Sequence, residues 1–119
     1  MAAKKSKIKK MRPDLKKKWV EALRSGKFIQ GTNALCYKEI EWDDTLNKAV
    51  EKETKHCCLG VLYKIIHRRN NFEASILSER DLRLTGLTDK VQKNLAGKND
   101  NRKAPWSFKR IAGWIERYL

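Results

Sequence analysis

The chain has 119 residues and a formal net charge of +14, from 28 Lys and Arg against 14 Asp and Glu. Hydrophobic residues make up 40% of it and charged residues 35%, which suffices for one modest core but not for two. No apolar run approaches the ~18 to 20 residues of a membrane-spanning helix, and the charged N-terminus lacks the apolar stretch of a signal peptide. We therefore expect one small domain that neither spans a membrane nor is secreted.

A basic leader opens the chain. Nine positive residues precede Trp19 against a single acid, Asp14: Lys4, Lys5, Lys7, Lys9, Lys10, Arg12, Lys16, Lys17 and Lys18. Such a block repels itself, so we expect residues 1–12 to be flexible and residues 13–119 to form the domain.

A first helix is predicted from about Pro13 to Ser25. Proline suits the first helical position because its missing N–H has no partner there, and Trp19 and Leu23 recur at helical spacing. Gly26 is placed to cap the end of this helix. Residues 28–37 are typical of two short extended pieces around a turn at 31–33.

The segment 39–53 is acidic, with six acids, two lysines and a net charge of −4. We expect an exposed loop with a short helix around 45–50. Glu39, Glu41, Asp43 and Asp44 carry the oxygen ligands that Mg²⁺ prefers, although a solvated acidic loop is the favoured interpretation. Trp42 lies among these acids and joins no helical stripe. It is either an exposed anchor for a protein partner or a side chain that folds back over the core.

The most apolar run, 57–67, favours a central buried helix, with a strand leading into a helix as the alternative. Three further helices are predicted at 78–86, 88–97 and 107–119, each beginning at a Ser or Thr N-cap. Together the elements predict a mainly α fold, or an α+β fold with one small β-hairpin near 28–37, built as a compact bundle of four to five helices. The predicted core consists of Leu15, Trp19, Leu23, Leu59, Leu62, Ile66, Leu82, Leu95, Ile111 and Ile115.

Three cysteines, Cys36, Cys57 and Cys58, make a poor disulfide framework because their number is odd and two are adjacent. We therefore expect a reducing compartment and no disulfide-linked partner. With His56 they offer four possible zinc ligands, but structural zinc sites space their ligands in pairs two to four residues apart. Buried free thiols are the favoured interpretation, no cofactor is predicted, and zinc is the alternative.

Three ordered blocks of this chain resemble a family of small bacteriophage and prophage proteins. The blocks are ALRSGKFIQG (22–31), HCCLGVL (56–62) and SFKRIAGWIERYL (107–119). Tyr63 and Lys64 depart from the family pattern, which continues the second block with Cys and an acid. The resemblance implies a phage-encoded protein acting in the cytoplasm of an infected bacterial host, and it indicates no activity.

The excess of positive charge favours nucleic-acid binding, because Lys and Arg that neutralise phosphates release counterions. The predicted contacts are Lys4, Lys5, Lys7, Lys9, Lys10, Arg12, Lys16, Lys17, Lys18, Arg68 and Arg69. No zinc-finger spacing, aromatic RNP motif or KH-type loop says whether the ligand is RNA or DNA. The leading hypothesis is an accessory protein that binds nucleic acid or a nucleic-acid-containing host complex.

Two other classes stay open. One is an anti-defence or host-takeover inhibitor that binds a host protein through Trp42, or a nucleotide signal through basic residues. The other is a metal-dependent hydrolase built on Asp43 and Asp44. The sequence contains no phosphate-binding glycine loop, and His56 beside Cys57 is only a sequence neighbour of a possible nucleophile. We therefore predict no enzyme.

Overall fold

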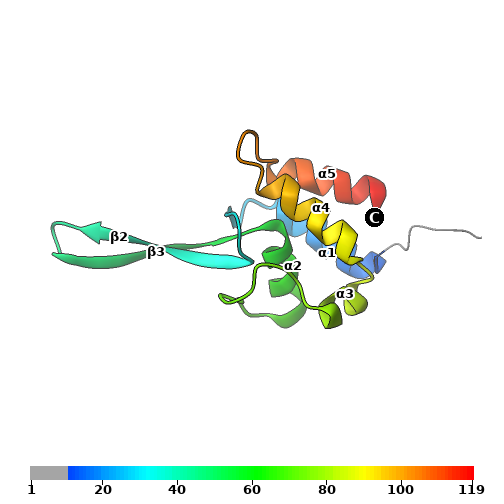
Figure 1. Ribbon diagram of the computed structural model, residues 1–119, viewed down its shortest axis with the longest axis horizontal. Coiled ribbons are helices and arrows are strands. Elements are labelled where there is room, and N and C mark those ends of the chain that lie inside the picture. The colour runs from blue at the N-terminus through cyan, green and yellow to red at the C-terminus, as the bar shows by residue number, and fades with distance from the viewer. Residues whose placement is uncertain (1–10) are drawn as a thin grey trace, which may run out of the picture.

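The computed structural model describes residues 11–119, which form five helices and three strands (Figure 1). In chain order these are α1 (Pro13–Arg24), β1 (Ile29–Gln30), β2 (Cys36–Asp43), β3 (Lys48–His56), α2 (Cys58–His67), α3 (Glu79–Thr85), α4 (Asp89–Asn99) and α5 (Phe108–Tyr118). The leader lysines Lys4, Lys5, Lys7, Lys9 and Lys10 lie outside the described residues.

The predicted helix starts are confirmed. The hydroxyls of Ser78, Thr88 and Ser107 each accept the backbone N–H three residues on, at 3.1 to 3.2 Å. Each therefore satisfies one of the free N–H groups at a helix start. The predicted end of α4 at Gly97 is wrong, because Gly97 lies inside the helix, which continues to Asn99.

The core surrounds α2, as predicted. Trp19 of α1, Leu95 of α4 and Ile111 of α5 are fully buried with Leu59 and Leu62 of α2. The indole N–H of Trp19 donates to the backbone carbonyl of Cys58 at 2.8 Å, which ties α1 to the first turn of α2. Of the ten predicted core residues, Leu15 and Ile66 are half-buried at the edge of this core and the others are buried.

The predicted mainly α bundle is wrong, because the fold is α+β with a three-stranded mixed sheet in the order β1-β3-β2. The small hairpin expected near 28–37 is also wrong. β3 lies between β1 and β2, so β1 pairs parallel with β3, at Ile29↔Lys55 and Gln30↔His56, and makes no pair with β2.

The acidic segment 39–53 forms strands rather than a loop with a short helix. β2 and β3 pair antiparallel as far as Asp43↔Lys48, and the Asp43 carboxylate accepts the N–H groups of Thr45 and Leu46 in the turn. Asn47 adopts a φ of 52°, a left-handed conformation that Asn tolerates. Apolar and acidic residues alternate from Glu39 to Asp43, which is the two-residue period of a strand.

β1 pairs only with Lys55 and His56 at the end of β3, so the rest of the β2–β3 hairpin is a sheet of two strands. We call residues 38–54, from the pair Lys38↔Thr54 to the turn, the hairpin arm. The arm projects away from the helices (Figure 1). None of the helices in residues 11–119 is long and apolar enough to cross a membrane.

Candidate nucleic-acid interface

Two cations and two tryptophans meet where α4 approaches α5. The Arg110 guanidinium carbon lies 3.9 Å from the centre of the Trp106 ring system. The Lys98 ammonium lies 4.7 Å from the same ring and 5.5 Å from that of Trp114. Both distances to Trp106 are within the ~6 Å range of cation–π attraction. We call these four residues the cation–tryptophan cluster.

Helical spacing and backbone contacts position the cluster. Trp106, Arg110 and Trp114 are each four residues apart, so they lie along one face of α5 and the residue before its cap. The N–H of Trp106 donates to the carbonyl of Lys98 at 3.0 Å, and its own carbonyl accepts from the Gln30 amide at 2.6 Å. These two hydrogen bonds hold the backbone of Trp106 in place, and the backbone sets where its ring begins.

The segment that carries the cluster is strongly positive. Residues 98–110 hold five basic residues and one acid, Asp100, for a net charge of +4. The Asp100 carboxylate accepts from the Asn33 N–H at 3.1 Å and the Asn99 amide at 2.8 Å. Within the described part of the chain, Lys98 and Arg110 form no ion pair with an acidic side chain. Their charge is therefore open to an outside anion.

The predicted contacts Arg12, Lys16, Lys17 and Lys18 differ in exposure and in pairing. Arg12 donates two hydrogen bonds to Asp14, at 2.8 and 3.2 Å, which neutralise its charge. Because consecutive helix residues are 100° apart, Lys16 is half-buried while Lys17 and Lys18 are exposed. The exposed acids Asp14 and Glu21 share the surface of α1 with them.

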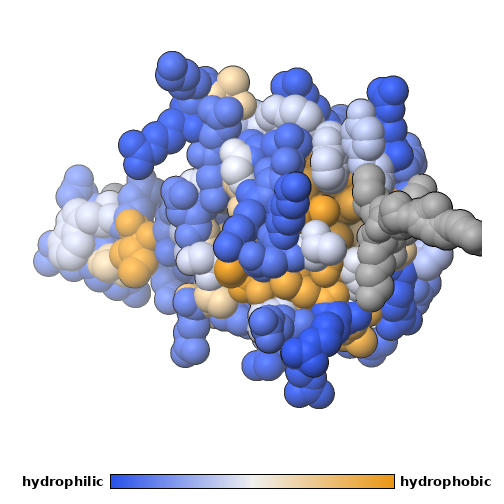
Figure 2. All heavy atoms as spheres, turned by 45° about the vertical axis from the view of Figure 1, so that its right-hand side comes forward, coloured by the Kyte–Doolittle hydropathy of each residue, from blue (hydrophilic) through white to orange (hydrophobic). Residues whose placement is uncertain are grey.

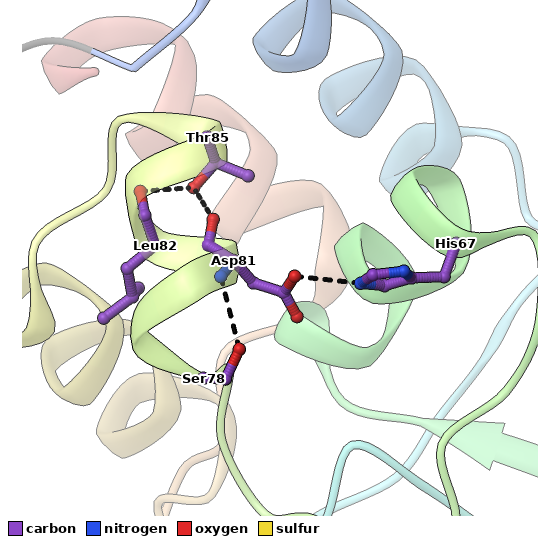
Figure 3. A network of polar contacts seen from close by, with 5 residues as sticks. All are labelled: His67, Ser78, Asp81, Leu82 and Thr85. Carbon is purple, nitrogen blue, oxygen red and sulfur yellow. Dashed lines mark hydrogen bonds and ion pairs between the residues drawn. The ribbon is translucent and has the colours of Figure 1, made fainter.

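The short helix α3 connects the two predicted groups of basic residues in the described part of the chain. At one end of α3, the Arg12 N–H donates to the Thr85 carbonyl at 2.8 Å. At the other end, Nε2 of His67 lies 2.9 Å from the carboxylate of the buried Asp81 (Figure 3). Arg68, which follows His67, adopts a φ of 57° at the end of α2, and Arg69 lies 6.0 Å from the Tyr63 ring. Arg12 and Arg68–Arg69 are thus brought near opposite ends of α3.

Trp42 is exposed, with 58% of its surface accessible, so the alternative in which it folds back over the core is wrong. The neighbouring acids Glu39 and Glu41 pair with Lys55 at 2.6 Å and with Lys52 at 2.7 Å. Across residues 11–119, no three His, Cys, Asp or Glu side chains are grouped so that they can hold a metal ion.

The three thiols are free, buried and engaged in different places. Cys36 donates to the Asn71 carbonyl at 3.0 Å, Cys57 accepts the Gly60 N–H at the start of α2, and Cys58 faces the Leu95 carbonyl. Burial raises the pKa of Cys57 to about 11 and also raises the pKa of Cys36 and Cys58. The thiolate form, which is the nucleophile and the metal ligand, is therefore disfavoured.

No residue of the cation–tryptophan cluster is among the contacts predicted from the sequence. The four-residue spacing of Trp106, Arg110 and Trp114 was the available signal. Lys98 comes from another helix, so only the packing of α4 on α5 reveals its place. Trp106 and Trp114 are half-buried rather than fully enclosed.

The comparisons with known proteins match the N-terminal two-thirds of the described chain. A family model described as Domain of unknown function (DUF8296) matches residues 11–83. The match covers the hairpin arm and ends within α3, before the cation–tryptophan cluster. No curated protein and no solved structure was found to match the chain. Because the family model covers more than half of its 119 residues, the chain belongs to the DUF8296 family.

Proposed function

We propose that this protein binds nucleic acid through its phosphates, with the cation–tryptophan cluster as the ordered part of the binding surface. The observation that carries the proposal is that Lys98 and Arg110 are held over tryptophan rings and have no acidic partner among residues 11–119. The basic leader adds a second, sequence-independent attraction. Phage accessory function in an infected bacterial cytoplasm is the biological setting that we propose with it.

The physical support comes from two properties of the cluster. A guanidinium stacked on an aromatic ring has already lost much of its rotational freedom, so less entropy is lost when it binds a phosphate. Proteins that bind single strands combine a positive groove with aromatic side chains on which bases stack. Arg102 and Lys103 extend the positive charge along the exposed loop between α4 and α5.

Fluorescence anisotropy of labelled single- and double-stranded RNA and DNA, at ~50 to 300 mM salt, tests the proposal. We expect the full chain to bind, with affinity that falls steeply as salt rises. The double variant Lys98→Gln/Arg110→Gln removes two phosphate contacts. The plot of log affinity against log salt should therefore be shallower by about two units than that of the wild type.

Arg80→Gln/Arg83→Gln is the matched control, because it removes two exposed charges from α3 instead. If both double variants weaken binding equally, the cluster has no special part in it. The contribution of the leader is measured on a chain that begins at Met11 rather than at Pro13. Met11 is buried and Arg12 is hydrogen-bonded to Thr85, so a later start damages the domain.

A further inference from the structure

The hairpin arm has one apolar face and one face of paired acids and lysines. Ile40 and Trp42 are two residues apart on β2, so their side chains share a face, and they are 70% and 58% exposed. Ala49 lies directly opposite Trp42 on β3 and is also exposed. A space-filling view shows hydrophobic residues gathered on the projecting part of the molecule (Figure 2). A two-stranded hairpin with an uncovered apolar face is marginal by itself.

The apolar face carries balanced charge. Glu51 stands opposite Ile40, and it pairs with Lys38 at 3.3 Å at the base of the arm. The acids Glu39, Glu41 and Asp43 alternate with Ile40 and Trp42 and therefore point to the other face. Two such apolar faces can meet without bringing an excess of one charge together.

The two ends of the arm complement each other. At the base, Lys38 lies 6.0 Å from the ring of Phe72, which is 52% exposed. At the tip, the turn holds Asp44 and Leu46, and Leu46 is 56% exposed. When two arms lie antiparallel, Asp44 and Leu46 at the tip of each one reach Lys38 and Phe72 at the base of the other.

The charge of the whole chain favours contact through the arms. The chain carries +14 while residues 39–53 carry −4, so the rest of the molecule, at +18, repels the same part of a second copy and attracts its arm. The arm projects from the helices (Figure 1), and repulsion between exposed charges is largely screened beyond ~8 Å at physiological salt. Contact at the arms leaves the two basic bodies apart.

We propose that the apolar face of the hairpin arm docks on the same face of a second copy of this chain, with the two arms antiparallel about a two-fold axis. In such an isologous contact, both copies contribute the same surface patch. An arm-sized interface is smaller than the ~1,200 Å² of stable complexes, which is typical of weak, reversible association. The proposal stands independently of nucleic-acid binding.

Sedimentation velocity of the full chain without nucleic acid, from ~5 to 500 µM in ~150 mM salt, tests the proposal. We expect the mass to rise with concentration from 13.9 kDa toward twice that value. Trp42→Ser should remain monomeric up to the highest concentration. Leu84→Ser, which alters an exposed apolar residue on α3, is the control and should dimerise like the wild type.

A second variant tests the antiparallel arrangement. Asp44→Lys reverses a charge at the tip, which the arrangement places near Lys38 and the positive body of the partner, so the dimer should weaken at least tenfold. Circular dichroism of each variant checks that the fold is intact. A wild type that stays monomeric at ~500 µM overturns the proposal, and so does a Trp42→Ser variant that dimerises normally. An Asp44→Lys variant with unchanged association overturns the antiparallel arrangement.

Discussion

Gly60 lies where α2 begins against the segment leading into β2. A Cβ atom at this position would overlap the backbone carbonyl of Leu35, which accepts the Cys57 N–H at 3.1 Å. The sequence alone suggests only the usual cost of glycine in a helix, ~1 kcal/mol relative to alanine. The close approach of two backbones explains the glycine.

Gly60→Ala should therefore lower the free energy of unfolding by about 3 kcal/mol or more, because backbone cannot move aside cheaply. Gly97→Ala is the matched control within a helix, since a Cβ there meets no atom within 4 Å. The control should raise stability by ~0.5 to 1 kcal/mol. Urea denaturation of both variants measures the contrast, and equal effects would show that the contact with Leu35 is not a constraint.

His56 makes stability depend on pH. Burial lowers its pKa from the ordinary value of 6.5, and this effect exceeds the opposing one of the hydrogen bond with Asn70 at 2.8 Å. The unfolded chain then binds a proton more readily than the folded chain below pH 6.5. The contribution of the neutral His56 to the free energy of unfolding is therefore fully present above pH 6.5. It is lost as the pH falls through the lower pKa that His56 has in the folded chain.

Urea denaturation from pH 7.5 to 5.0 should show this loss in the wild type. His56→Gln should show a smaller fall over the same range, whatever its stability at pH 7.5, because it cannot take up the proton. If the plots of stability against pH were parallel for the two proteins, His56 would have the same pKa in the folded and the unfolded chain.

At the scale of elements, one buried amide joins the sheet to the helices. The Asn99 side chain donates to the Gly31 carbonyl at 2.8 Å, and its oxygen accepts from the Cys58 N–H at 3.2 Å and from Gln30 at 3.1 Å. These bonds connect the end of α4 with the start of α2 and with the segment after β1.

Asn99→Asp replaces the donor with an oxygen that faces the Gly31 carbonyl and the Asp100 carboxylate. We expect a loss of about 3 kcal/mol of stability, because the buried carboxylate would lack a cationic partner. Asn94→Asp makes the same change at an exposed position of α4 and should stay within about 0.5 kcal/mol of the wild type. Thermal unfolding of the pair measures the difference, and a similar shift in both would contradict this role of Asn99.

Helix starts were predictable because their cause is local. Helices α3, α4 and α5 each begin at a hydroxyl, that of Ser78, Thr88 or Ser107, which accepts the backbone N–H three residues on. That signal is complete within one turn of the chain. The hairpin arm was missed because its net charge was given more weight than the alternation of Ile40 and Trp42 with acids.

The candidate site was predictable only in part, for a related reason. Trp106, Arg110 and Trp114 share one helix face, which spacing indicates. The approach of Lys98 depends on how α4 packs on α5, and no local pattern contains that contact.

At the scale of the whole molecule, charge is divided between parts. The hairpin arm is acidic between residues 39 and 53, the segment 98–110 carries +4, and the chain as a whole carries +14. Nucleic acid should therefore contact the helical body and avoid the arm. This predicts that Trp42→Ser leaves nucleic-acid affinity within about twofold of the wild type while it abolishes self-association at the same salt concentration. An anisotropy titration of this variant checks the first part, and a large loss of affinity would place the arm in the nucleic-acid interface.

The most direct test of the central claim is the salt dependence of nucleic-acid affinity for the full chain and for Lys98→Gln/Arg110→Gln. We expect measurable binding by the wild type at ~50 mM salt, with a log–log slope about two units steeper than that of the variant. Absence of wild-type binding at ~50 mM salt would contradict nucleic-acid binding itself. Equal slopes would contradict the role of the cation–tryptophan cluster.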